Sequence, residues 1–323
     1  MHGGDALVKV VIAGGTGSLG RALTSVLLAR GHEVVVLTRT PRPGAVADGV
    51  RQVAWDARTG GPWESELEGE DVGLVNLAGR LVDARPTPAT IADLTRSRVE
   101  ATAALVAASQ HLERPLRRWV QASTTAIWSD AGEARLDESS PIPVGLPQMT
   151  GVAERWEHAL AGHRSDHTVV LRTGIVLEAH TPALDRLLLL ARWGLGGPVG
   201  GGRQWVSWIH VDDWVRIVLC ALGLDEPALP DGVVVASAPH PVRNAELMRT
   251  LRRHAGGIGR ISPGRWIGLP TPAPVLRVGA VLLRTDPALG LTGRHATSTV
   301  LDEAGFRFDH PHLDGAVTAL LGR

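Results

Sequence analysis

Apolar residues along this chain occur in short unbroken runs that alternate with longer amphipathic segments. The β-branched run Leu7 to Ala13 precedes a helical pattern from Arg21 to Arg30, and Glu33 to Leu37 forms a second apolar run. Runs without alternating polar positions are typical of parallel strands that helices cover on both faces. The first forty residues therefore predict a strand, a helix and a parallel strand, which together make one βαβ unit.

The alternation of strand and helix patterns continues along the chain. Further strands are predicted at 50–54, 72–77, 119–123, 168–171 and 232–236, and helices at 88–110, 152–161, 181–194 and 211–222. This order predicts an α/β protein with a Rossmann-type doubly wound parallel sheet. After Leu177, stretches rich in Gly and Pro interrupt the pattern, so we expect a smaller, partly discontinuous C-terminal substrate lobe.

The composition excludes several classes of protein. Of 323 residues, 44% are hydrophobic, and 33 basic side chains balance 33 acidic ones, which indicates an ordinary globular protein without a nucleic-acid or membrane partner. The single cysteine, Cys220, excludes an internal disulfide and is compatible with a reducing cytosol. Because the N-terminus lacks a secretory pattern and no apolar stretch reaches about 20 residues, we expect a cytoplasmic protein.

A glycine-rich turn follows the first predicted strand and opens the first predicted helix. The turn contains Gly14, Thr16, Gly17, Ser18, Leu19 and Gly20. Glycines at this spacing let the backbone approach a pyrophosphate, and the amides of the next helix point toward it. A tight turn without a ligand is the alternative, but the strand before it and the helix after it favour dinucleotide binding.

The end of the second predicted strand indicates which dinucleotide is bound. An NAD enzyme would place Asp or Glu here to bind the ribose 2′-hydroxyl, whereas this chain has Thr38 and Arg39. A guanidinium and a hydroxyl suit a 2′-phosphate, so the sequence favours NADP(H) as cofactor. The alternative is an ordinary surface arginine.

These and later motifs resemble an extended short-chain dehydrogenase/reductase and, more narrowly, its atypical epimerase-family branch. The resemblance extends over essentially the whole chain. Its motifs are the glycine turn, Trp55-Asp56, Asn76 to Gly79, Ser97-Arg98 with Thr102, Ala122 to Ala126, Leu171 to Leu177, Gly201 to Trp205 and Ser207 to Asp213. The resemblance implies an NADP-binding Rossmann domain at 1–175 with return elements near 211–236, and a substrate-binding lobe at 176–210 and 237–323.

The resemblance also assigns expected roles to individual residues. It implies that the glycine turn and Arg39 contact the cofactor, that Asp56 contacts the adenine, and that Thr125 donates a hydrogen bond to a substrate oxygen. Along the pyrophosphate, ribose and nicotinamide it places Asn76, Leu77, Ala78, Gly79, Ile175 and Val176. For Asp56 and Asn76, capping of a turn or helix is the alternative.

The proton donor of the resembled family is missing. That family uses a Tyr-x-x-x-Lys pair, but this chain has no tyrosine, and its only lysine is Lys9. The segment from Leu146 to Glu157, where the pair would lie, offers Met149, Thr150, Glu154, Arg155 and Glu157. We therefore expect Thr125, Thr150 or a water ordered by Glu154 to serve instead. The alternative for Glu154 and Glu157 is a solvated helix face.

Tryptophan and arginine side chains mark the expected substrate side. The candidates are Trp128, Arg203, Trp205 and Trp208, although tryptophans at this density often belong to a core. Nucleotide-sugar enzymes of the resembled family carry an arginine where this chain has Ser207, which disfavours a nucleotide-sugar substrate unless Arg203 replaces it. His210, Asp212 and Asp213 are expected to join the lobe to the sheet, with the carboxylates capping a helix near Trp214. No histidine spacing suggests a metal site.

Three functions remain open at this point. The first is an NADPH-dependent oxidoreductase that acts on a small, fairly apolar carbonyl or conjugated substrate without the usual Tyr/Lys pair. The second is a non-catalytic NADPH-binding regulatory module. The third is a nucleotide-sugar epimerase or dehydratase, which Ser207 disfavours.

Overall fold

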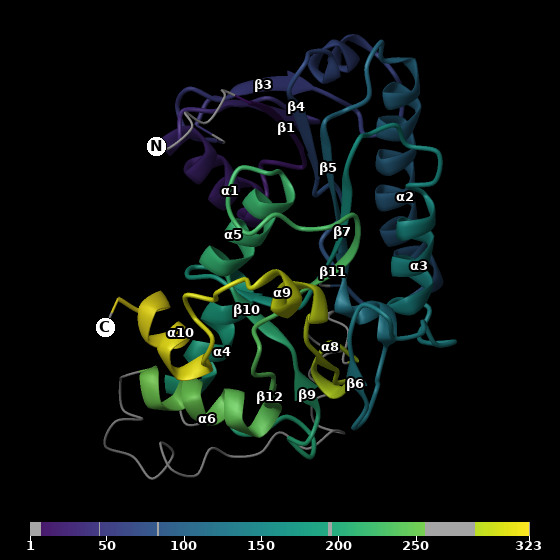
Figure 1. The fold of residues 1–323 in the computed structure, drawn as a ribbon. Helices are drawn as coiled ribbons and strands as arrows, with labels where there is room; N and C mark the ends of the chain where they lie inside the picture. The colour runs from purple at the N-terminus through teal and green to yellow at the C-terminus, as the bar shows by residue number, and fades with distance from the viewer. Residues whose placement is uncertain (1–7, 45, 83, 193–195, 256–287, 323) are drawn as a thin grey trace.

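A seven-stranded parallel sheet forms the centre of the protein (Figure 1). The computed structural model describes residues 8–44, 46–82, 84–192, 196–255 and 288–322. In sheet order the strands are β11 (Gly232–Ala236), β7 (Thr168–Thr173), β5 (Arg118–Thr124), β4 (Val72–Asn76), β1 (Lys9–Ala13), β2 (Glu33–Thr38) and β3 (Arg51–Ala54). This order is that of a doubly wound Rossmann-like sheet, as the apolar runs predicted.

Strand β1 shows why an unbroken apolar run is needed at the centre of the sheet. Val10 and Ile12 enter one hydrophobic core, whereas Val11 and Ala13 enter the core on the opposite face. Ala13 pairs with Leu37 of β2 and with Asn76 of β4. The carboxyl ends of the three strands therefore lie side by side, at the point where the strand order reverses and ligands usually bind in such sheets.

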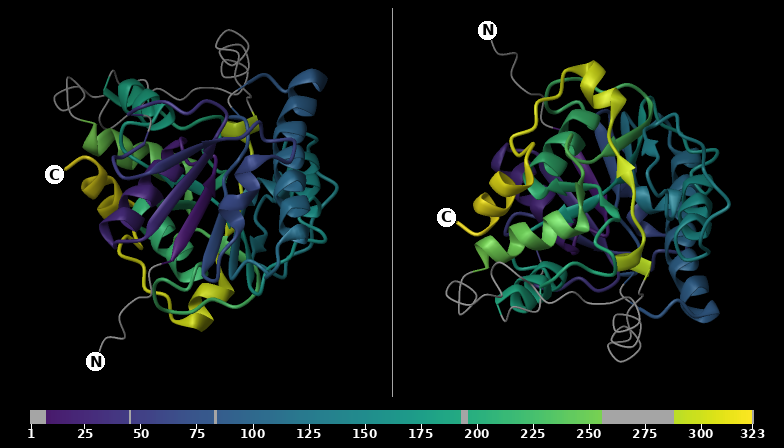
Figure 2. Two further views of the ribbon diagram at one scale, coloured as in Figure 1. Left: turned by 90° about the horizontal axis from the view of Figure 1, so that it is seen from above. Right: turned by 90° about the horizontal axis from the view of Figure 1, so that it is seen from below.

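Helices cover both faces of the sheet (Figures 1 and 2). On one face lie α2 (Pro88–His111) and α3 (Thr150–His158), and on the other lie α1 (Ser18–Ala29) and α5 (Val211–Ala221). Leu23 and Leu27 of α1 share a core with Ile217 and Val218 of α5. Helix α1 begins at Ser18, three residues earlier than the sequence pattern suggested.

A smaller lobe is built on the carboxyl side of the sheet (Figure 1). Its helices are α4 (Pro182–Arg192), α6 (Asn244–His254), α8 (Ala288–Leu291) and α10 (Leu313–Leu320). Helix α9 (Thr299–Ala304) and the short turns η1 (Pro62–Leu67) and η2 (Thr125–Trp128) belong to the main domain. The short strands of the lobe pair as β8 (Ile175–Leu177) with β10 (Trp208–His210), β9 (Trp205–Val206) with β12 (Val242–Arg243), and β6 (Arg135–Leu136) with β13 (His295–Ala296).

The cores show which segments pack with which domain. Leu188 of α4, Leu251 of α6 and Val317 of α10 form the core of the lobe. By contrast, Leu301 of α9 and Phe306 belong to the core of the main domain, together with α1 and α5. Part of the region 237–323, expected to form the lobe, therefore packs against the sheet instead. Among the described residues, no helix has the length and apolarity needed to cross a membrane.

Two glycines in helices allow a matched test of this packing. A Cβ atom on Gly20 in α1 would lie 2.5 Å from Cα of Gly15, whereas a Cβ on Gly151 in α3 would meet nothing within 4 Å. We expect Gly20→Ala to lower the free energy of unfolding by about 2–3 kcal/mol through overpacking. Gly151→Ala should be neutral or slightly stabilising, because Ala favours helix. Urea titration of both variants checks this, and equal midpoints would contradict it.

Candidate functional site

The glycine turn presents bare backbone amides at the start of α1. Gly14 has φ of +79°, a conformation that glycine adopts without cost, and a Cβ there would lie 2.9 Å from the backbone of Leu77. Gly17 is the N-cap, so no side chain caps the helix, and no acidic residue lies in its first turn. The first-turn amides of Ser18 and Leu19 and the positive end of the helix dipole thus remain available to an anion.

An uncompensated cation lies at the end of the neighbouring strand. Arg39 directly follows β2, is exposed, and forms no ion pair or hydrogen bond with the residues that the structure describes. The loop beyond it is fixed because Gln52 accepts the Arg42 amide N–H at 3.1 Å. A guanidinium held free at this edge can bind a phosphate group.

Asp56, at the end of β3, is committed to its own turn. Its Oδ1 accepts the amides of Arg58 and Thr59 at 2.8 and 2.9 Å, and its Oδ2 accepts the Thr59 hydroxyl at 2.7 Å. These hydrogen bonds, chiefly those from Thr59, lower the pKa of the Asp56 carboxyl. The carboxylate is exposed, so it retains lone pairs that an adenine amino group could use.

The loop after β4 is held from below by a buried amide. Asn76 is 0% exposed; its Nδ2 donates to Thr102 and to Gln121, both at 3.0 Å, and its Oδ1 accepts the Ala78 amide at 3.1 Å. The expectation that the Asn76 side chain contacts the cofactor is therefore corrected, because all of its polar atoms are used inside the protein. It positions Leu77, Ala78 and Gly79, of which Gly79 is exposed.

A half-buried arginine packs against the same loop. A Cβ on Gly79 would lie 3.1 Å from Cζ of Arg98, which donates to the backbone oxygens of Leu94 and Arg80. Burial lowers the pKa of Arg98 to about 10, so it keeps its positive charge at neutral pH. Its charge adds to the positive potential at the carboxyl edge. The sequence marked Ser97-Arg98 only as part of a motif.

Three consecutive residues at the carboxyl end of β5 carry hydroxyls, and two of these hydroxyls can serve a ligand. Ser123 donates to Glu157 Oε1 at 2.5 Å. Thr124 accepts the Ala126 amide at 3.1 Å and keeps its own proton. Thr125 is 4% exposed, and its hydroxyl forms no hydrogen bond with the described residues. Thr124 and Thr125 are therefore the two possible donors here, and the sequence interpretation considered only Thr125.

Glu157 forms a buried ion pair, which corrects the alternative of a solvated helix face. Arg172 Nε and Nη2 donate to the two carboxylate oxygens of Glu157 at 2.9 and 2.8 Å, and the side chains are 6% and 13% exposed for Arg172 and Glu157. The Arg172 guanidinium also lies 5.1 Å from the ring centre of Trp128. This pair ties α3 to β5 and β7 behind the hydroxyls.

The other candidate donors on α3 differ in their surroundings. Thr150 donates to the Ile127 carbonyl at 2.7 Å and lies 2.7 Å from the Ser129 hydroxyl, so its one proton is already used. The expectation that Thr150 acts as a donor is corrected for this reason. Glu154 is half-buried and has no hydrogen bond or ion pair within the described chain, so it remains available.

The expected nicotinamide residues lie on β8. Ile175 is 48% exposed although it is a large apolar side chain, and Val176 next to it is half-buried. Ile175 donates its amide to the Ser207 carbonyl at 2.8 Å, which holds β8 against β10. An exposed apolar side chain of this kind offers a surface for a flat apolar ring.

The four substrate candidates divide into two pairs. Trp128 and Trp208 are 1% and 0% exposed, and their indole N–H groups donate to the carbonyls of Ser140 and His240. The expectation that these two rings line a cleft is wrong, because both are core side chains. Trp205 is half-buried between Arg243, at 3.8 Å from its ring centre, and His295. Arg203 is exposed.

Residues 210 to 213 do join two segments, but not through the expected caps. Helix α5 begins at Val211, and His210 caps it by accepting the Asp212 amide at 3.1 Å. Asp213 accepts the amides of Asp309 and His310, which holds the C-terminal segment against α5. Burial and neighbouring His310 lower the pKa of His210 to about 4, so its ring is neutral.

His210, Asp212 and His310 place possible ligand atoms within 4.8 Å of one another. The centres of the two histidine rings lie 3.8 Å apart with their planes tilted by 34°, and Nδ1 of His210 already accepts a hydrogen bond. Because that nitrogen is used within the protein, this cluster suits packing better than metal coordination.

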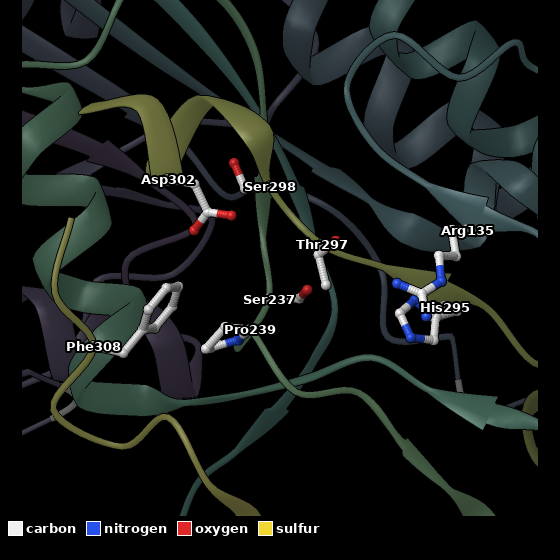
Figure 3. Close-up of a pocket in the computed structure, with 8 residues that line it drawn as sticks. All are labelled: Arg135, Ser237, Pro239, His295, Thr297, Ser298, Asp302 and Phe308. Carbon is white, nitrogen blue, oxygen red and sulfur yellow. The ribbon is translucent and has the colours of Figure 1, made fainter. Parts of the chain in front are cut away.

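A small cavity of about 110 Å³ lies elsewhere (Figure 3). Its walls come from β6, the segment after β11, β13 and α9, and the labelled side chains are Arg135, Ser237, Pro239, His295, Thr297, Ser298, Asp302 and Phe308. None of the expected cofactor or substrate residues lies among them. The cavity therefore shares no lining residue with the expected site, although its Ser237 directly follows β11 at the carboxyl edge of the sheet.

Comparisons with known proteins agree with this geometry. The sequence profile of the NAD-dependent epimerase/dehydratase family matches residues 10–149, and a domain of unknown function, DUF1731, matches 271–320. The human epimerase family protein SDR39U1 is 32% identical over 319 residues, which cover 97% of this chain and 100% of that protein.

Solved structures show the same similarity. The crystal structure of human SDR39U1 (isoform 2) with NADPH has a TM-score of 0.82 at 29% identity, and the alignment covers 98% of this chain and 100% of that one. A nucleoside-diphosphate sugar epimerase from Corynebacterium glutamicum has a TM-score of 0.74 at 27% identity, covering 98% of this chain and 59% of the other.

The buried ion pair allows a test of how the site is held. Glu157→Gln should lower the free energy of unfolding by about 3–5 kcal/mol, because it leaves the Arg172 charge buried without a partner. Glu154→Gln, one turn earlier on the same helix, should change it by less than about 0.5 kcal/mol. Adding Arg172→Met to Glu157→Gln should restore part of the loss. Denaturant unfolding checks all three variants, and equal stability of the two single variants would contradict the assignment.

Proposed function

Because the chain belongs to the SDR39U1-like epimerase family of extended short-chain dehydrogenases/reductases, we propose that it is an NADPH-dependent oxidoreductase. Its substrate is a small carbonyl or conjugated compound. A solved relative that covers nearly the whole chain was crystallised with NADPH, which supports the cofactor.

The observation that carries the proposal is the pairing of the bare start of α1 with the free Arg39. The amides of Ser18 and Leu19 suit the pyrophosphate, and Arg39 lies at the end of the adjacent strand, where the adenosine ribose is expected. Among the described residues that end β2, none is acidic, so nothing there repels a 2′-phosphate. The residues present therefore fit NADPH better than NADH.

When bound, NADPH supplies a hydride from its nicotinamide ring. The side chains of this chain must place that ring and polarise the substrate oxygen. Ile175 offers the apolar contact for the ring, and Thr125 offers a hydroxyl that no described residue engages. A threonine hydroxyl orients and stabilises but does not titrate near neutral pH, so it acts as a hydrogen-bond donor rather than as the acid.

The proton that completes the reaction must come from water or from Glu154. Lys9 lies at the amino end of β1, at the opposite edge of the sheet, and its Nζ donates to the Glu68 carbonyl at 2.6 Å. Thr150 has no free proton, and Glu157 is paired with Arg172. Glu154 is the remaining carboxylate on α3 without a partner in the described chain.

A non-catalytic NADPH-binding module is the second candidate. The absence of tyrosine and the remote position of Lys9 favour it, since a positioned acid contributes roughly 10²–10⁴-fold to rate. Incubating the NADPH-loaded protein with a library of carbonyl and conjugated compounds separates the two candidates. Oxidation of NADPH, followed by its absorbance, supports the enzyme, and tight binding without oxidation supports the module.

Cofactor preference depends on Arg39. Arg39→Ala should weaken NADPH binding roughly 10- to 150-fold, which corresponds to the loss of one charge-assisted hydrogen bond, and should leave NADH binding nearly unchanged. Arg114→Ala, which removes an exposed arginine paired with Glu70 at the amino edge, is the control and should affect neither cofactor. Fluorescence titration measures both affinities. Equal losses for NADPH and NADH would refute the role of Arg39.

The hydroxyl that polarises the substrate can be identified by two matched variants. With a substrate from the library, Thr125→Val should lower kcat roughly 10²–10³-fold and leave the NADPH dissociation constant within a few-fold. Thr124→Val should lower kcat much less than Thr125→Val does. A reversed result would assign the role to Thr124, and full activity of both variants would place the donor elsewhere.

Loss of activity in Glu154→Gln would identify that carboxylate as the proton source, and retention of activity would point to water.

A further inference from the structure

Arg294 is held at the meeting point of three segments of the candidate site. It lies between α8 and β13; its Nε donates to the Ser129 carbonyl, and its Nη2 donates to the Thr292 hydroxyl at 2.6 Å. Nη2 also lies 3.4 Å from Sδ of Met149. Its backbone N–H donates to the Trp205 carbonyl, and its backbone carbonyl accepts the Ser207 hydroxyl at 2.8 Å.

These contacts place Arg294 beside the reacting end of the site. Ser129 directly follows η2, the turn that begins with Thr125, and Met149 directly precedes α3. Ser207, which binds the backbone of Arg294, also accepts the amide of Ile175 through its carbonyl. Arg294 therefore lies between the hydroxyl-bearing turn and the strand expected to flank the nicotinamide.

The charge of Arg294 forms no ion pair in the described part of the chain, although the charge of Asp130 lies near enough to raise the pKa of Arg294. Its partners are a carbonyl, a hydroxyl and a thioether, all of them neutral. The neighbouring carboxylate, Asp130, accepts the Gly293 amide at 2.9 Å and forms no ion pair with the guanidinium. Burial lowers the pKa of Arg294 to about 10, which leaves it charged at neutral pH but poorly solvated. Arg172, by contrast, is fully paired with Glu157.

One nitrogen of this guanidinium remains free. Nε donates to the Ser129 carbonyl and Nη2 to the Thr292 hydroxyl, whereas Nη1 has no acceptor among the described residues. The side chain is half-buried, so a ligand can reach this nitrogen. The next residue, His295, lines the cavity of Figure 3 together with Arg135. Arg294 itself is not among the residues that line this cavity. A free N–H pair on a desolvated cation is a binding site for a negatively charged oxygen.

We propose that Arg294 binds a carboxylate of the substrate. The substrates of the proposed oxidoreductase are then small, mainly apolar carboxylic acids. The inference rests on the proposed function for the identity of the site. A single free nitrogen suits one carboxylate. It would leave most of a diphosphate uncompensated in a partly desolvated site, which is costly. Ile175 binds the same Ser207 that contacts Arg294, and its exposed apolar side chain favours an apolar remainder of the substrate.

The test compares two probes that differ in charge. Protein saturated with NADP⁺ is titrated by calorimetry with 4-phenylbutanoate and with its neutral analogue 4-phenylbutanamide. The wild type should bind the carboxylate roughly 10- to 100-fold more tightly than the amide, and Arg294→Met should abolish this preference. Arg294→Lys keeps the positive charge and should retain part of the preference for the carboxylate. Arg135→Met removes the exposed arginine that lines the cavity of Figure 3 and should retain the full preference for the carboxylate.

Each other outcome overturns the assignment. Equal binding of the two probes, no binding of either at millimolar concentration, or a preference that survives Arg294→Met would each do so. Loss of the preference in Arg135→Met would place the anion in the cavity of Figure 3 instead. If Arg294→Met does not fold, the wild type and the Arg294→Lys and Arg135→Met variants still decide. NADPH titration without a probe is the separate test of the proposed function. If NADPH does not bind, the same probe titrations are carried out on the apoprotein, so the two failures remain distinguishable.

Discussion

The close approach of α1 to β1 is the constraint on which the rest of the site depends. Gly20 lies against Gly15, and Gly14 lies against the backbone of Leu77, so no Cβ atom fits at either contact. Because the helix can come this close, its first-turn amides face the point where β1, β2 and β4 end together. The phosphate site is thus made by backbone geometry, and side chains are needed only at its margins.

Buried polar contacts fix the loops at this edge. Asn76 holds the turn after β4, and the pair of Glu157 and Arg172 ties the ends of β5 and β7 to α3. Several residues whose chemistry suggested catalysis therefore have a structural role, because a buried polar group must be satisfied within the protein. Among the candidate donors on β5, η2 and α3, their satisfaction leaves Thr124, Thr125 and Glu154 able to act on a ligand.

The balanced net charge conceals an uneven distribution. The chain has 33 basic and 33 acidic side chains, but ion pairs such as Arg51 with Glu33 and Arg114 with Glu70 lie away from the carboxyl edge. Near that edge Arg39, Arg98 and Arg294 have no carboxylate partner in the described chain. These three cations lie where an anionic cofactor and, by our proposal, an acidic substrate would bind.

Sequence alone determined the local features. Unbroken apolar runs predicted the parallel sheet, and the spacing of Gly14, Gly17 and Gly20 predicted the turn, because both depend on residues close together in the chain. The resemblance supplied the family and the expected positions of the site residues.

Only the tertiary structure decided which side chains are free. Trp128 and Trp208 looked like cleft residues and proved to be core, and Glu157 looked solvated and proved to be paired. Arg294 reaches the site from a segment 165 residues away from Ser129, and no local pattern marked it. Burial and pairing depend on contacts between distant segments, so the identity of a residue cannot reveal whether its charge or hydroxyl is already used.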